Sequence, residues 1–113
     1  MGRQAAKPRL SREALELVAR RFRTLGDATR LALVQALFGE ERTVQELCAL
    51  TGASQANASK HLALLHEQGL VARRRDSLFT YYRIVDPTLE RLCHVVCGSL
   101  AKRHAAMGAN LAS

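Results

Sequence analysis

The sequence contains little cysteine and has no apolar run that could cross a membrane. Three cysteines among 113 residues are an odd number, so we expect free thiols and no full disulfide framework. No stretch approaches the roughly 18 apolar residues that a bilayer-spanning helix needs. Residues 1–10 are basic and show no apolar segment of the kind found in secretion signals. We therefore expect a cytoplasmic protein.

Features that would support an enzyme are also missing. The chain has no glycine-rich phosphate-binding loop, no paired carboxylates that suggest a pocket, and no histidine with an orienting acid near a cysteine at a recognisable catalytic spacing. We therefore predict that the protein is not an enzyme. A thiol enzyme with Cys93 or Cys97 as nucleophile is the alternative, which an assay of thiol reactivity and turnover would reveal.

Positive charge is abundant. Seventeen Lys and Arg outnumber ten Asp and Glu, which gives a net charge of +7, and 48% of the residues are hydrophobic. The length fits one domain with its own core, and the charge attracts polyanions such as nucleic acid. A nonspecific architectural DNA binder is one possibility, and it predicts a steep salt dependence without a preferred sequence.

Apolar residues recur at steps of three and four, and this period predicts four helices in the first part of the chain. Each helix is bracketed by a capping residue and a glycine. The N-caps are Ser11, Asp27, Thr43 and Ser54, and the stops are Gly26, Gly39, Gly52 and Gly69. Thr43 and Glu46 also have the spacing of a capping box. Because only a tight, glycine-containing turn separates them, the third and fourth helices are expected to form a helix-turn-helix.

After Gly69 the period changes to two, which predicts a two-stranded ribbon that turns at Asp76 and Ser77. Asp86 and Pro87 then begin a long last helix that reaches Met107. We predict a mainly α fold with a small β-hairpin, a winged helix-turn-helix. It comprises a basic flexible arm (1–10), one DNA-binding and dimerisation domain (11–107) and a flexible tail (108–113).

The fourth helix has the composition of a DNA-reading helix, because its first turns carry amides, hydroxyls and basic groups. The hairpin that follows carries arginines that could straddle a phosphate backbone or enter a minor groove. The candidate DNA contacts are Ser54, Gln55, Asn57, Ser59, Lys60, His61, Arg73, Arg74, Arg75 and Arg83. The alternatives are an ordinary polar helix face and a solvated charge run.

Three segments resemble the ArsR/SmtB family of bacterial transcriptional repressors. They are LGDATRLALVQAL (25–37), SQANASKHLALLHEQGLV (54–71) and FTYYRI (79–84). The resemblance implies a homodimer assembled from the first and last helices, which binds an inverted repeat in a promoter and leaves it when an effector binds. Independently, the apolar faces of those two helices exceed what one small core needs, which fits a subunit interface.

Cys93 and Cys97 lie four residues apart, so both thiols fall on one face of the last helix. Such a pair suits thiophilic effectors, above all trivalent arsenic or antimony, with a third sulfur from Cys48, the partner subunit or a small molecule. The same thiols could instead sense oxidants or reactive sulfur, or be small buried hydrophobes. His94 and His104 are secondary candidates. No metal is needed for folding.

The resemblance to this family narrows the range of candidate effectors. Arsenic-sensing members carry clustered thiols in the third helix, where TVQELC retains only Cys48. Zinc-sensing members carry an Asp, two His and a Glu on the last helix. This chain has Arg91, Cys93, His104 and Met107 there and lacks both carboxylates. Members that sense sulfur species use a second-helix cysteine, which is absent here. A metalloid bound by Cys93 and Cys97 on the last helix is therefore the preferred interpretation.

Overall fold

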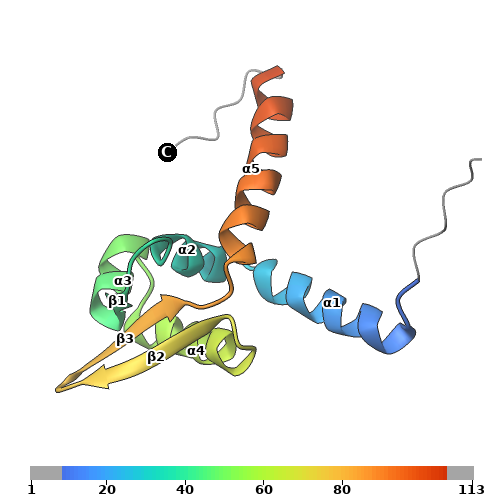
Figure 1. The fold of residues 1–113 in the computed structure, drawn as a ribbon. Coiled ribbons are helices and arrows are strands. Elements are labelled where there is room, and N and C mark those ends of the chain that lie inside the picture. The colour runs from blue at the N-terminus through green and yellow to red at the C-terminus, as the bar shows by residue number, and fades with distance from the viewer. Residues whose placement is uncertain (1–8, 107–113) are drawn as a thin grey trace, which may run out of the picture.

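The computed structural model describes residues 9–106 and contains five helices and three strands in that part of the chain (Figure 1). Their order is α1 (Arg12–Leu25), α2 (Ala28–Ala36), β1 (Arg42–Thr43), α3 (Val44–Thr51), α4 (Gln55–Glu67), β2 (Val71–Asp76), β3 (Phe79–Ile84) and α5 (Thr88–Ala106). This order confirms the winged helix-turn-helix architecture. Most of the expected arm, the expected tail and Met107 lie outside the described residues.

The helices begin at the residues that the sequence marks as caps. The hydroxyl of Ser11 accepts a hydrogen bond from the backbone N–H of Ala14 at 3.1 Å. At α3 the capping box is complete, because Thr43 Oγ1 accepts from the Glu46 N–H at 3.1 Å and Glu46 Oε1 accepts from the Thr43 N–H at 2.8 Å. These bonds satisfy backbone donors that a helix N-terminus leaves unpaired.

Three expected boundaries were wrong. α2 ends at Ala36 and does not reach Gly39, because the N–H groups of Leu37 and Phe38 bond three residues back instead of four. The hairpin turn is formed by Ser77 and Leu78, since Asp76 already pairs with Phe79. α5 begins at Thr88, one residue later than expected.

The expected two-stranded ribbon is a three-stranded antiparallel sheet with the order β1-β3-β2. The added strand is only two residues long, and Arg42 and Thr43 pair with Tyr82 and Tyr81. A segment this short has no measurable period, so the sequence pattern could not reveal it. Its consequence is that the hairpin is fastened to the start of α3 and does not project as a free ribbon.

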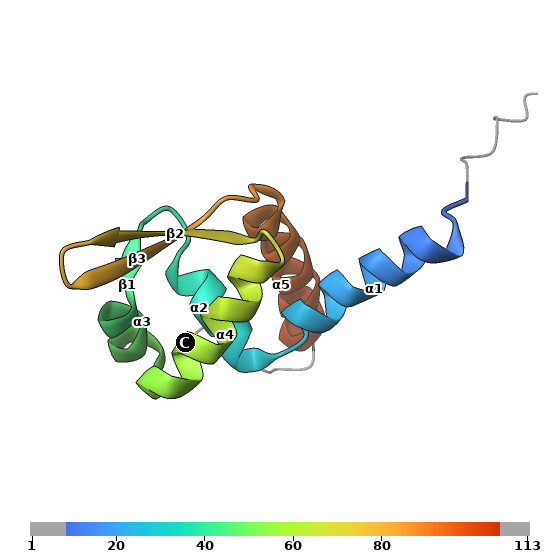
Figure 2. The same ribbon diagram turned by 90° about the horizontal axis from the view of Figure 1, so that it is seen from below.

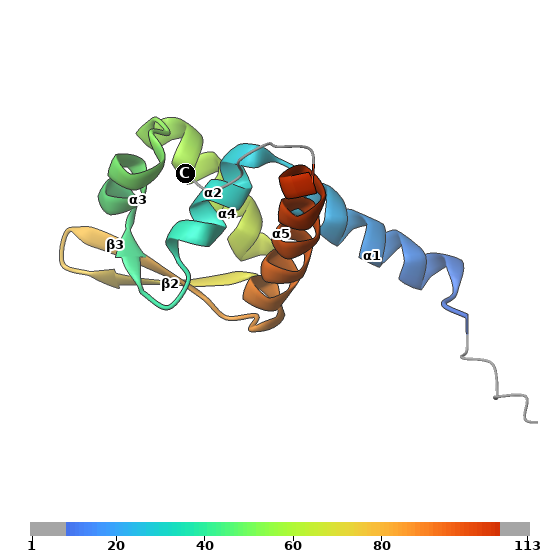
Figure 3. The ribbon, with the colours of Figure 1, turned by 90° about the horizontal axis from the view of Figure 1, so that it is seen from above.

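The core lies between α2, α3, α4 and the base of the hairpin. Its fully buried side chains include Leu33, Leu47, Leu62, Leu65 and Leu89. α1 extends away from this core, as Figures 2 and 3 show from opposite sides, and most of α5 extends away from it in Figure 1. The radius of gyration is 17.3 Å, against about 13 Å for a compact chain of some 100 residues.

The two projecting helices expose apolar side chains that a single subunit leaves in water. On α1 these are Leu15, Leu17, Val18 and Phe22, and on α5 they are Val95, Val96 and Leu100, each between 42% and 69% exposed. Exposed apolar surface of this extent on two elements marks an interaction site. A single subunit therefore leaves apolar surface unburied on both α1 and α5.

Candidate nucleic-acid interface and thiol pair

α4 lies beside the hairpin, on the side of the body away from the projecting part of α5 (Figure 1). Ala58, Leu62 and Leu65 face the core and are fully buried, so the intervening residues point outward. Among the candidates on α4 and at its N-cap, the exposed residues are Ser54, Gln55, Asn57, Ser59 and Lys60. The Ser54 hydroxyl also caps the helix by accepting from the Asn57 N–H at 3.1 Å. The structure thus brings these five residues together in the first turns of one helix.

His61 differs from its neighbours because it is half-buried and makes a side-chain contact with α2. Its Nδ1 lies 3.0 Å from Nη1 of Arg30. The same guanidinium donates from Nε to the backbone carbonyl of Thr24 at 2.7 Å. Arg30 was not singled out in the sequence, where nothing distinguishes it from the other arginines of the first two helices. Only the packing of α1, α2 and α4 reveals this contact.

The four arginines of the hairpin divide between the two faces of the sheet. Pairing places Arg73 opposite Tyr82 and Arg75 opposite Thr80, whereas Arg74 pairs with Tyr81 and Arg83 with Ala72. Side chains alternate along a strand, so Arg73 and Arg75 share one face while Arg74 and Arg83 share the other. All four are exposed.

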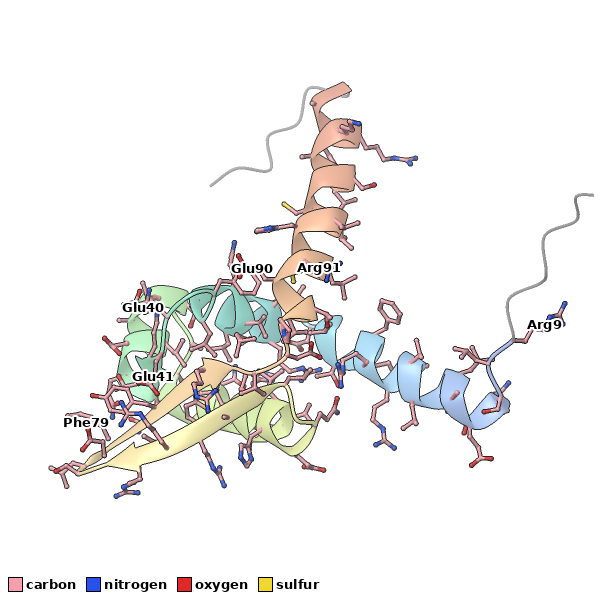
Figure 4. The ribbon with its side chains drawn as sticks, viewed as in Figure 1. Arg9, Glu40, Glu41, Phe79, Glu90 and Arg91 are labelled. Atoms are coloured by element: carbon pink, nitrogen blue, oxygen red, sulfur yellow. The ribbon has the colours of Figure 1, made fainter. Side chains whose placement is uncertain are left out.

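Arg74 is held by a carboxylate that the sequence analysis did not identify. Its Nε and Nη2 donate to the two carboxylate oxygens of Glu41 at 2.8 and 2.7 Å, and its guanidinium lies 4.4 Å from the centre of the Tyr81 ring. Figure 4 shows Glu41 beside the hairpin, with Phe79 near the tip. The hydrogen bonds from Arg74, followed by the charges of Arg74 and Arg83, lower the pKa of Glu41. Arg74 therefore fastens the hairpin to the segment before β1.

The thiol pair lies on the part of α5 that leaves the core. Leu89 is buried in the core, Cys93 is half-buried one turn later, and Cys97 is exposed another turn on. Burial, and secondly the nearby Cys97 thiol, raise the pKa of Cys93. Both thiols are free, so this face of α5 can offer two sulfur ligands.

Cys48 does not join this pair within one chain. It lies on α3 and packs against the core, and α2 lies between α3 and α5 (Figures 1 and 3). In the described residues, no three His, Cys, Asp or Glu side chains gather in a way that could hold a metal ion. His94 contacts the edge of the Phe38 ring at 6.2 Å between centroids, and His104 is half-buried.

An ion pair that the sequence did not indicate joins the two projecting helices at their bases. Nη1 of Arg21 on α1 donates to Oδ2 of Asp86 at 3.0 Å. Asp86 also accepts from the hydroxyl and the backbone N–H of Thr88 at the start of α5. These bonds from Thr88, and then the one from Arg21, lower the pKa of Asp86. α1 is thereby tied to the first turn of the helix that carries the thiols.

The order of elements, the polar α4 and the basic hairpin define a winged helix-turn-helix protein. No described helix has the length and apolar character that crossing a membrane requires. A family model described as the bacterial regulatory protein arsR family matches residues 27–73. The chain belongs to this family, because it is also 30% identical to a possible ArsR-family regulator whose DNA-binding fragment has a known structure, and the match covers 94% of that fragment.

That structure is the homodimeric winged helix-turn-helix domain of a possible ArsR-family regulator from Mycobacterium bovis, with a TM-score of 0.70 over 90% of this chain. The AntR antimony-specific transcriptional repressor gives a TM-score of 0.77 at 28% identity, covering 90% of this chain and 92% of its own.

Two curated relatives carry names that concern resistance to thiophilic elements. A probable mercury resistance operon repressor from Streptomyces lividans is 40% identical over 68% of this chain. The arsenical resistance operon repressor of Escherichia coli is 42% identical over 56% of this chain. The matches span 62% and 55% of these two relatives' own lengths.

Proposed function

We propose that the protein is a dimeric transcriptional repressor that binds a DNA operator through α4 and the hairpin and releases it when Cys93 and Cys97 bind a thiophilic effector. The observation that carries the DNA part is the exposed polar face of α4 beside the basic hairpin. An α-helix fits the major groove of B-DNA, and arginines beside it can reach phosphates or the minor groove. Gln55, Asn57 and Lys60 are the candidate base readers.

Among the hairpin arginines, we assign DNA contact to Arg73, Arg75 and Arg83. Arg74 is already paired with Glu41, so its first role is to hold the hairpin. Ser54, Ser59 and the N-terminus of α4 are suited to phosphate, because hydroxyl and backbone N–H groups are common phosphate donors. His61 is the remaining α4 contact.

The dimer follows from the exposed apolar faces of α1 and α5. One recognition helix contacts too few base pairs for useful specificity, whereas two helices related by a dyad can read successive major grooves of an inverted repeat. A self-complementary interface buries the same patch on both subunits. The homodimeric relative from Mycobacterium bovis supports this assembly.

The effector assignment rests on the chemistry of the pair on α5. Two thiols one turn apart suit trivalent arsenic or antimony, which prefer three sulfur ligands. Because Cys48 lies elsewhere in the chain, the third sulfur would come from the partner subunit or a small thiol. The relatives named for mercury, arsenical and antimony responses support a thiophilic effector.

Sensing of reactive sulfur is the second candidate, and the two-thiol geometry favours it as much as a metalloid. Oxidative or persulfide chemistry needs only two thiols and no third ligand. Metalloid sensing and reactive-sulfur sensing both use Cys93 and Cys97, so the two proposals differ only in the effector.

The test is fluorescence anisotropy of the reduced protein on a fragment from upstream of its own coding sequence, with a random duplex as reference at one salt concentration. We expect a preference for the upstream fragment that arsenite or antimonite reduces by about 5- to 150-fold, the range of a 1 to 3 kcal/mol coupling. Cys93→Ser and Cys97→Ser should abolish the response, whereas Cys48→Ser should leave it unchanged where a small thiol supplies the third sulfur.

The remaining outcomes are equally informative. A response to a persulfide donor and none to the metalloids would replace the metalloid by reactive sulfur. Equal affinity with and without all effectors would refute thiol control. Equal affinity for both duplexes would refute sequence-specific repression and favour a nonspecific DNA binder.

A further inference from the structure

The guanidinium of Arg30 joins three elements. From α2, its Nε donates to the carbonyl of Thr24 at 2.7 Å and its Nη2 reaches the carbonyl of Arg23 at 3.5 Å, both at the end of α1. Its Nη1 faces Nδ1 of His61 on α4 at 3.0 Å. All three nitrogens are therefore engaged, and one rigid fork spans the gap between the first helix and the helix proposed to read DNA.

The chemistry of this contact fixes the state of the imidazole. A guanidinium has only donors and keeps its proton in proteins, so Nδ1 of His61 must be the acceptor. A neutral imidazole with a bare Nδ1 carries its proton on Nε2. A doubly protonated ring would lose this hydrogen bond and place its charge against that of Arg30.

Two charged residues, Asp27 and Lys60, are close neighbours of the Arg30–His61 contact along the chain. Asp27 caps α2 by accepting from the Arg30 N–H at 3.0 Å. That hydrogen bond is the main cause of the lowered pKa of Asp27, to which the charge of Arg30 also contributes. Lys60 precedes His61 on α4, and α1 offers only backbone carbonyls to Arg30.

The other ring nitrogen is free to act on a ligand. Within residues 9–106, Nε2 of His61 makes no hydrogen bond, and no buried polar side-chain atom lacks a partner. Nε2 therefore reaches solvent. His61 follows Lys60 in the second turn of α4, close to the exposed residues of the first turn.

We propose that Arg30 is a positioning residue that holds His61 in its neutral, Nε2-protonated tautomer, so that this imidazole offers DNA one hydrogen-bond donor of fixed direction. The acceptor is a phosphate oxygen or a purine N7 or O6 atom, which share this chemistry. The lock makes His61 a donor of fixed direction, unlike Lys60, whose ammonium is a mobile point charge. The DNA part rests on the proposed function, whereas the tautomer is a property of the free protein.

The lock is tested first without DNA, by nitrogen-15 NMR of the histidine rings at about pH 8, where an ordinary imidazole is neutral. We expect His61 to show one protonated nitrogen, Nε2, and one bare nitrogen, Nδ1. Arg30→Lys keeps the positive charge but cannot bridge α1 and the ring, so it should give a mixture of tautomers. Arg20→Lys, on the exposed face of α1, is the matched control and should leave the signals unchanged.

The role in binding is tested by a double-mutant cycle on operator affinity. His61→Gln retains a side-chain N–H donor of similar reach and should bind within about threefold of the wild type, whereas His61→Phe keeps the ring shape and should bind about tenfold more weakly. Arg30→Lys should cost about two- to threefold in the wild-type background, since a mixture leaves about half of the rings without a proton on Nε2, and it should leave the affinity unchanged with His61→Phe, because Arg30 acts through the imidazole. An equal loss on operator and random duplex would identify phosphate, and a loss on the operator alone a base edge.

Three results would overturn the proposal. One is a wild-type His61 that carries its proton on Nδ1 or shows both tautomers. Another is an Arg30→Lys penalty that is the same in both backgrounds, since this would mean a structural role only. The third is His61→Phe with wild-type affinity. If the wild type binds no DNA at all while the tautomer is single, the proposed function fails and the lock stands.

Discussion

Replacing Phe22 by alanine should weaken the proposed dimer more than any other single truncation on α1. Phe22 belongs to the apolar stripe of that helix together with Leu15 and Val18, and it is 58% exposed in the single chain. An aromatic side chain of this kind buries about 200 Å² when fully covered, so about 115 Å² remains to be buried by a partner. Only the burial of this exposed area contributes to the free energy of association.

The expected magnitude follows from that area. At about 25 cal/mol per Å², the uncovered part of Phe22 is worth up to about 3 kcal/mol in each subunit. A twofold interface contains two copies, so the upper bound is about 6 kcal/mol per dimer. Because area converts incompletely into affinity, we expect about half of this bound, which raises the dimer dissociation constant about 100-fold.

Sedimentation velocity over a range of concentrations measures that constant directly. Leu78→Ala is the matched control, because Leu78 is 82% exposed at the tip of the hairpin, far from α1 and α5. It should leave the dissociation constant unchanged. A wild-type protein that sediments as a single subunit throughout, or a Phe22→Ala variant with wild-type association, would refute the assignment of α1 to the interface.

Three further predictions concern the core, the thiols and the hairpin. Leu62→Ala removes a fully buried side chain from the inner face of α4 and should cost about 2 to 5 kcal/mol in urea unfolding; a loss below 1 kcal/mol would contradict its place in the core. Cys93 should alkylate more slowly at neutral pH than the exposed Cys97, because its raised pKa leaves less thiolate, and the difference should narrow as the pH rises through that pKa. Mass spectrometry of labelled protein checks this, and equal rates at neutral pH would contradict it. Glu41→Gln weakens the hold on Arg74, so the slope of log affinity against log salt should steepen by about 0.9 as one more arginine becomes available to phosphate; an unchanged slope would count against this role.

The local signals in the sequence predicted the elements well because their physics is local. Ser11, Asp27, Thr43 and Ser54 cap helices within three residues of themselves, and the structure confirms each cap. The alternation after Gly69 likewise predicted the hairpin. Where a boundary depended on longer-range contacts, the prediction failed, as at β1, whose two residues form a strand only because β3 lies beside them.

The sequence predicted which residues make up the candidate site, but it did not predict the hydrogen bonds that hold some of them in place. Exposed polar residues on α4 and arginines on the hairpin follow from periodicity, whereas nothing in the sequence distinguishes Arg30 or Arg74 from arginines that remain unpaired. Both are engaged by residues 31 and 33 positions away. Such pairings depend on how the helices and strands pack, and one sequence carries no direct record of that.

A connected set of contacts leads from α5, which carries the thiol pair, to α4, the proposed recognition helix. Asp86 at the start of α5 binds Arg21 on α1 at 3.0 Å, and the end of α1 binds Arg30, which binds His61 on α4. Since Cys93 lies one turn beyond the buried Leu89, an effector bound there acts where α5 leaves the core. In the proposed repressor, a shift of α5 against the dimer would therefore move α1 and, through Arg30, the donor that α4 offers to DNA. The predicted signature is that Arg21→Gln, which breaks the first of these contacts and changes no residue of either site, reduces the effect of the metalloid on operator affinity while leaving the affinity of the effector-free protein within about twofold.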